Sequence, residues 1–91
     1  MQPLAQFVPR ALADLVRPAP LSPGKVDFAW RTSVGPGMAR VSGVRLEGNT
    51  LLVDAQTPQW AAAIMRATPV ILPRLQALLG AEHVRSIRLR T

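Results

Sequence analysis

The stretch V-R-L-E-G-N-T-L-L-V-D-A, residues 44–55, decides the fold. Its centre, Gly48-Asn49, predicts a two-residue turn between two strands, because both residues accept the backbone angles that a tight hairpin needs. Counting outward from the turn gives the register Glu47 with Thr50, Leu46 with Leu51, Arg45 with Leu52 and Val44 with Val53. The paired apolar side chains then share one face of the hairpin, and that face is predicted to cover the core.

Helix starts are predicted on both sides of the hairpin from Ser-Pro and Thr-Pro pairs. In such a pair the hydroxyl accepts an unpaired amide at the N-cap, and the proline occupies the first helical position. The pairs are Ser22-Pro23, Thr57-Pro58 and Thr68-Pro69. Gly35-Pro36-Gly37 is predicted to end the first of these helices and Gly80 the last. Pro73 predicts a kink or a delayed start in the last helix.

A third strand is predicted at residues 84–90, because Ile87 and Leu89 alternate there with Arg88 and Arg90. Residues 1–17 carry apolar side chains at helical spacing, with the firm helix expected to begin near Pro9. The prolines at 18 and 20 make a short stiff linker after it. We therefore expect a helical arm and linker over residues 1–21 and one folded domain over residues 22–91.

The predicted class is α+β. After the arm the order is helix–strand–strand–helix–helix–strand, with a three-stranded antiparallel or mixed sheet and helices on one face. The side chains expected to share one core are Trp30, Val44, Leu46, Leu51, Val53, Trp60, Ile64, Leu75, Leu79, Ile87 and Leu89.

Charge is the main clue to partners. The 91 residues carry eleven Lys and Arg against five Asp and Glu, a formal net charge of +6, which favours a polyanionic partner. Ten of the eleven bases are Arg, which a GC-rich coding bias also produces. With no cysteine, no long apolar run and no signal-like start, we expect a cytoplasmic protein that does not enter a membrane.

Residues for catalysis are scarce. His83 is the single histidine, its neighbour Glu82 is adjacent in sequence, and the other carboxylates are scattered singly. Gly35-Pro36-Gly37 indicates a turn and not a phosphate-binding loop. We therefore expect no enzyme, no metal site, no cofactor and no small-molecule substrate, and we interpret His83 as a helix-end or loop residue beside the Gly80 cap.

Nucleic-acid contact is expected to come from arginine and not from base stacking. The predicted strands contain no aromatic residue, and both tryptophans fall on helical apolar stripes. The candidate phosphate-binding residues are Lys25, Arg31, Arg40, Arg45, Arg66, Arg74, Arg85, Arg88 and Arg90. Arg85, Arg88 and Arg90 form the centre of this prediction, because Arg88 and Arg90 share the face opposite Ile87 and Leu89. The alternative is a solvated basic surface with no ligand.

Several segments, in order, resemble the DciA-type family of bacterial replicative helicase loaders. They are W-R-T-S-V-G at 30–35, G-N-T-L-L-V at 48–53, Trp60-Ala61, L-Q-A-L-L-G at 75–80 and V-R-S-I-R-L at 84–89. The resemblance implies a KH-like domain of the type II order, DNA binding in single-stranded or duplex form, and interaction with the replicative helicase. The matched residues are chiefly structural, so the resemblance assigns no contact residue.

The GXXG loop with which KH domains grip nucleic acid is absent, since no two glycines are three residues apart. The expected function is a non-enzymatic DNA-binding adaptor for helicase loading, with arginine on phosphate and another surface, such as residues 4–17, on the helicase. An RNA-binding domain and a protein-interaction module with a basic surface remain the alternatives.

Overall fold

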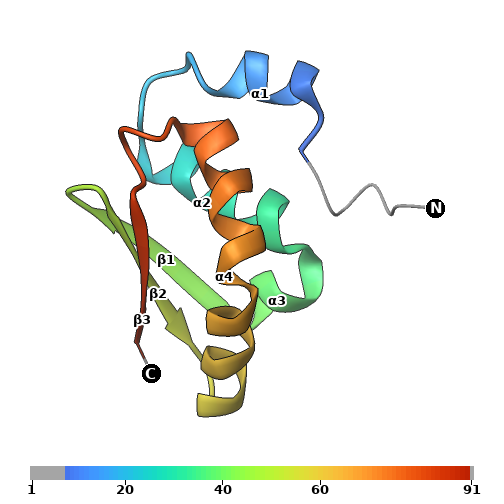
Figure 1. The fold of residues 1–91 in the computed structure, drawn as a ribbon, viewed down its shortest axis with the longest axis vertical. Helices are drawn as coiled ribbons and strands as arrows, with labels where there is room; N and C mark the ends of the chain where they lie inside the picture. The colour runs from blue at the N-terminus through green and yellow to red at the C-terminus, as the bar shows by residue number, and fades with distance from the viewer. Residues whose placement is uncertain (1–7, 91) are drawn as a thin grey trace.

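The computed structural model describes residues 8–90, which form four helices and three strands (Figure 1). In chain order they are α1 (Arg10–Val16), α2 (Pro23–Val34), α3 (Pro36–Arg40), β1 (Ser42–Glu47), β2 (Thr50–Ala55), α4 (Pro58–Leu79) and β3 (Ser86–Arg90). The predicted arm helix is present as α1, and the part of the arm before Val8 lies outside the described residues.

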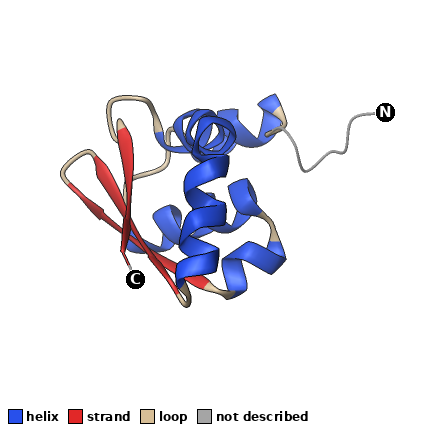
Figure 2. Cartoon of the chain, turned by 60° about the horizontal axis from the view of Figure 1, so that its bottom comes forward, coloured by secondary structure: helices blue, strands red, loops and turns tan. Residues whose placement is uncertain are grey.

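The sheet has the strand order β1-β2-β3. β1 and β2 pair antiparallel in the predicted register, with Glu47 opposite Thr50 and Val44 opposite Val53, which confirms the hairpin. β3 pairs parallel to β2, so the sheet is mixed. Helices cover one face of the sheet and leave the other face open (Figure 2). The predicted α+β class and the one-sided arrangement are therefore confirmed.

Two of the three predicted helix starts are confirmed. The Ser22 hydroxyl accepts the Lys25 amide at 3.1 Å, and the Thr57 hydroxyl accepts the Trp60 amide at 3.1 Å. The start at Thr68 is wrong, because Thr68 lies inside α4 and its hydroxyl donates to the Ile64 carbonyl at 3.1 Å. In that position the side chain returns its hydrogen bond to the preceding turn and caps nothing.

A single helix of 22 residues thus stands where two were predicted, with Pro69 and Pro73 inside it. The prolines weaken the helical hydrogen bonding, but the buried stripe of Ile64, Ile71 and Leu75 continues through them. Burial of that stripe against the sheet outweighs the local helix-breaking signal. The helix–helix turn of the type II KH order is consequently not present within residues 58–79, and the short α3 is an element the sequence did not predict.

The core lies between the sheet and the helices. Its buried members are Val26, Ala29, Trp30, Leu51, Val53, Ala55, Ile64, Ile71, Leu75, Leu78, Leu79 and Val84. Val44, Leu46, Ile87 and Leu89 are half-buried and pack against them, as predicted. Gly80 ends α4 at φ 96°, a conformation that favours glycine, and its amide donates to the Gln76 carbonyl.

The prediction that Trp60 lies in the core is wrong, since 37% of it is exposed. Trp60 belongs to the first turn of α4, and helical side chains tilt toward the N-terminus of their helix. A first-turn side chain therefore reaches past the start of its helix, where fewer neighbours cover it. Trp30, in the third turn of α2, is 1% exposed and is the central aromatic of the core.

The exposure of Trp60 sets the expected cost of removing it. Trp60→Ala should lower the free energy of unfolding by about 1–2 kcal/mol, below the range of about 3–5 kcal/mol for a fully buried tryptophan. Urea denaturation followed by circular dichroism measures this. A loss of about 4 kcal/mol or more would show that the indole is buried in solution.

The arm is tied to the domain by a buried lysine. The Lys25 ammonium donates to the carbonyls of Arg17 and Ala19, at 2.9 and 2.6 Å. The half-buried Leu12 and Val16 of α1 pack against the core, and α1 lies against α4. Lys25 therefore holds the linker between α1 and α2, and its charge is withdrawn from the surface.

Candidate nucleic-acid interface

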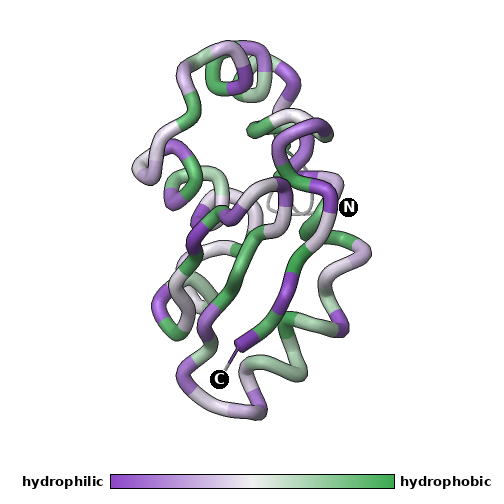
Figure 3. Tube along the Cα trace, turned by 90° about the vertical axis from the view of Figure 1, so that its left-hand side faces the viewer, coloured by the Kyte–Doolittle hydropathy of each residue, from purple (hydrophilic) through white to green (hydrophobic). Residues whose placement is uncertain are grey.

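The open face of the sheet carries three rows of side chains that the strand register places side by side. The rows are Glu47, Thr50 and Ser86; Arg45, Leu52 and Arg88; and Gly43, Asp54 and Arg90. Figure 3 faces this side, and hydrophilic and hydrophobic residues alternate along β3 toward the C-terminus. The middle row places an arginine on each side of Leu52.

The burial of Leu52 indicates that Arg45 and Arg88 lie close against the sheet. Leu52 is 8% exposed, although it belongs to the open face, which no helix covers. Its two cross-strand neighbours are Arg45 and Arg88, and arginine covers apolar surface with its methylene stem while its guanidinium stays in water. The two guanidinium groups are thus held at the surface on either side of one leucine.

Ion pairs divide the arginines of the sheet into two kinds. Arg45 lies 2.9 Å from the Glu47 carboxylate, and Arg90 lies 3.3 Å from that of Asp54. The parallel register places Asp54 opposite Arg90, so Arg90 has an acidic partner that its neighbours in sequence do not supply. Arg88 has no ion-pair partner within residues 8–90.

Beside the sheet, Arg85 likewise has no acidic partner within residues 8–90. It precedes β3, is exposed, and its backbone amide donates to the Asn49 carbonyl of the hairpin turn at 2.8 Å. This bond fixes the backbone of Arg85 beside the turn while its side chain remains at the surface. We call four residues the strand arginines: Arg45, Arg88 and Arg90 of the strands, and Arg85 directly before β3.

The remaining candidates do not join this group. Lys25 is buried on the linker carbonyls, and Arg74 is half-buried, with its Nη1 donating to the Ser33 carbonyl at 2.8 Å. Both are predicted phosphate contacts, and in the structure both donate to carbonyls of their own chain. Arg31 pairs with Asp27 at 2.9 Å on α2, while Arg40 and Arg66 lie exposed on α3 and α4. The nine predicted residues are therefore distributed over two layers of the fold.

His83 lies in the turn that follows the Gly80 cap of α4, which agrees with its interpretation as a residue beside the helix end. Its Nδ1 is 2.6 Å from the Leu79 carbonyl, and since a carbonyl can only accept, Nδ1 carries the proton. Within residues 8–90 no three His, Cys, Asp or Glu residues gather where they could hold a metal ion.

His83→Ala should therefore leave any binding of nucleic acid unchanged and lower the free energy of unfolding by about 0.5–1.5 kcal/mol, the value of one hydrogen bond. Parallel denaturation and oligonucleotide titrations measure the two effects. Loss of binding in a variant of unchanged stability would contradict a purely structural role.

Two features of the open sheet face could not be predicted from the sequence. The pairing of Arg90 with Asp54 and the burial of Leu52 both depend on β3 lying parallel to β2, and alternation alone does not say which strand pairs with which. A hollow between β3 and the middle of α4 also went unpredicted, because the sequence suggested a helix break at that point.

No helix in the described part of the chain is long and apolar enough to cross a bilayer.

Comparison with known proteins identifies a family for this chain. No curated protein and no solved structure matches this chain. The family model described as Dna[CI] antecedent, DciA, matches residues 1–89 of the 91. The chain belongs to the DciA family, whose general role is helicase loading in DNA replication.

Proposed function

We propose that this chain is a non-enzymatic, cytoplasmic DNA-binding adaptor that promotes loading of the replicative DNA helicase in bacterial replication. The observation that carries the DNA-binding part is the pair Arg85 and Arg88, exposed and without acidic partners in residues 8–90, beside an open sheet face. Membership of the DciA family supports the helicase-loading part.

The proposed contact is with phosphate. A guanidinium offers a planar fork of N–H donors that fits phosphate oxygens, and such contacts do not read base sequence. The strands carry no aromatic side chain, so the open face lacks a stacking platform for bases. Binding should therefore be independent of sequence and strongly dependent on salt.

The helicase would meet a different surface. We place that contact on the arm at residues 4–17, because its helix α1 presents Leu15 with 77% of it exposed and lies in the helical layer, away from the open face. An adaptor of this kind holds DNA and helicase at the same time, and it needs no catalytic residue of its own. Residues 22–91 would form the DNA-binding domain.

The test is a titration with labelled single-stranded DNA, duplex DNA and RNA of two unrelated sequences each. With about four phosphates neutralised, the slope of log K against log salt should be about −3 to −4, and shallower for single strands than for duplex. Pull-down with the purified replicative helicase of the same host should capture the chain. Tighter binding of RNA than of either DNA would favour an RNA-binding domain, and no binding to any probe would favour a protein-interaction module.

A further inference from the structure

The outer edge of β3 is unpaired. The strand order β1-β2-β3 places β3 at the rim of the sheet, and no other strand of residues 8–90 pairs with its second side. An edge strand presents a row of backbone N–H and C=O groups that another extended segment can join. Recognition by strand addition uses such an edge together with pockets for alternate side chains.

A hollow of about 690 Å³ lies along this edge. It is lined by Thr50, Met65, Thr68, Pro69, Ser86, Ile87, Arg88 and Leu89, and we call it the edge groove. Its apolar wall is incompletely covered, since Met65 is 61% exposed and Ile87 and Leu89 are half-buried. The groove thus combines a free strand edge with an apolar surface for side chains.

The helix wall of the groove also carries backbone acceptors. Pro69 and Pro73 lie inside α4, and proline has no backbone N–H. The carbonyls four residues earlier, at Met65 and Pro69, therefore lack the amide donor that an uninterrupted helix supplies. Both of these residues line the edge groove.

Charge selects the chemistry of the occupant. A strand added to β3 alternates its side chains between the two faces of the sheet. On the open face they would meet Arg88, which has no ion-pair partner in residues 8–90, and Arg90, whose partner is Asp54. On the other face they would meet the apolar wall at Met65. The complementary segment therefore has acidic residues alternating with apolar ones.

Other occupants fit less well. In a second copy joined through β3, the arginines of the two open faces would lie opposite one another, and like charges across strands are destabilising. Residues 1–7 contain no acidic residue to match Arg88.

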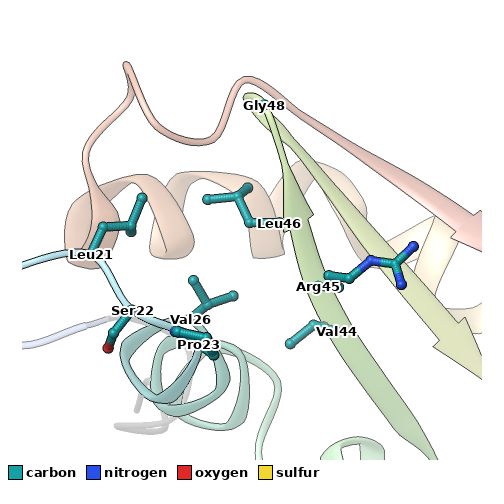
Figure 4. Close-up of a pocket in the computed structure, with 8 residues that line it drawn as sticks. All are labelled: Leu21, Ser22, Pro23, Val26, Val44, Arg45, Leu46 and Gly48. Carbon is teal, nitrogen blue, oxygen red and sulfur yellow. The ribbon is translucent and has the colours of Figure 1, made fainter.

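The opposite edge also offers a hollow, of about 340 Å³ between β1 and the start of α2. Figure 4 shows Leu21, Val26 and Leu46 around it, with Arg45 pointing away. Arg45 is already paired with Glu47, so this edge has no unpartnered charge to select an acidic strand.

We propose that the edge groove docks an extended segment of a partner protein in which acidic and apolar residues alternate, added as a fourth strand beside β3. The docking site goes beyond the proposed DNA binding and does not depend on it, although both use Arg88. The apolar half of the groove, represented by Met65, belongs to the docking site alone.

The test uses two labelled octapeptides of identical composition, one with glutamate and valine alternating and one with the four glutamates and four valines in separate blocks. The alternating peptide should bind the full chain at least about tenfold more tightly, because only it places acids and valines on opposite sides of one strand. Hydrogen exchange should show alternate amides of residues 86–90 becoming protected when it binds.

Two variants separate the halves of the site. Arg88→Glu should weaken the alternating peptide by at least about tenfold, since a charge-assisted contact becomes a repulsion. Met65→Ser should weaken it by about three- to tenfold and leave DNA binding unchanged, because it removes apolar contact and no charge. Arg40→Glu, an equal charge reversal on α3, should change peptide binding by less than about threefold at physiological salt.

Equal binding of the two peptides, or no protection in residues 86–90, would overturn the proposal even if DNA binding is observed. If Met65→Ser weakens the binding of a single-stranded oligonucleotide and leaves peptide binding unchanged, the groove is a nucleic-acid site and the proposal is wrong. Absence of DNA binding with intact peptide binding would overturn the proposed function and leave the docking site standing.

Discussion

Replacing Trp30 with alanine is expected to lower the free energy of unfolding by about 3–5 kcal/mol, the largest stability loss from a single substitution in this chain. Trp30 is 1% exposed in the middle of the core. Its indole N–H donates to the Ser42 hydroxyl at 2.9 Å, and that hydroxyl donates to the Met38 carbonyl at 2.7 Å. One side chain thus joins α2, α3 and β1 as well as filling the core.

Urea denaturation followed by circular dichroism measures the loss, and Trp60 remains as a fluorescent reporter. A domain of this size has a stability of about 5–15 kcal/mol, so the variant should lose a large share of it. Ser42→Ala, which removes the hydroxyl and keeps the indole, should cost about 1–2 kcal/mol. A Trp30→Ala cost no greater than that of Trp60→Ala would contradict the central placement of Trp30.

Replacing Arg85 and Arg88 together with glutamine is expected to weaken DNA binding by roughly 25- to 60-fold at about 0.1 M salt. Each phosphate contact contributes about 0.7–0.9 to the salt slope, which corresponds to about five- to eightfold in affinity between 1 M and 0.1 M salt. Both side chains are exposed and outside the core, so the fold should be retained. The loss should be similar for unrelated DNA sequences, because the contacts are with phosphate.

Removing the acid beside Arg90 is expected to have the opposite effect, a gain in DNA affinity. Asp54→Asn removes the carboxylate that lies 3.3 Å from Arg90 and competes with phosphate for that guanidinium. DNA affinity should rise, by up to about five- to eightfold at about 0.1 M salt, the value of one full phosphate contact. A titration in which Asp54→Asn weakens binding would show that Arg90 needs its carboxylate to hold the productive orientation.

The parts of the fold that could be predicted are those set by neighbours in sequence. The Gly48-Asn49 turn fixed the pairing of Leu46 with Leu51, because a two-residue loop leaves one register that buries both. The caps at Ser22 and Thr57 depend on one hydroxyl and an amide three residues later.

The incorrect predictions concern residues whose state is set by distant segments. The pair Thr68-Pro69 has the same local pattern as the two correct caps, but burial of Ile64 and Ile71 on one stripe carries α4 through it. Lys25 is predicted as a phosphate contact, but it is buried on the carbonyls of Arg17 and Ala19, and only the folded-back linker supplies those carbonyls.

The candidate site was predicted only in part, because some of its features are set by residues distant in sequence. Alternation along residues 86–90 assigned Arg88 and Arg90 to one face, and the structure agrees. The difference between them could not be predicted, because the acid that pairs with Arg90 comes from β2 through the parallel register.

The central claim is that phosphate is held by the strand arginines, and specifically by Arg85 and Arg88. The most direct test compares salt slopes for duplex DNA between the wild-type chain, Arg85→Gln/Arg88→Gln and the matched double variant Arg40→Gln/Arg66→Gln, which removes the same charge from α3 and α4. The first double variant should flatten the slope by one to two units, about one for each arginine–phosphate pair removed, and the matched variant should leave it within about half a unit of wild type. Equal flattening by both variants would show that net charge and not the strand arginines holds DNA, and an unchanged slope in the first would contradict the claim outright.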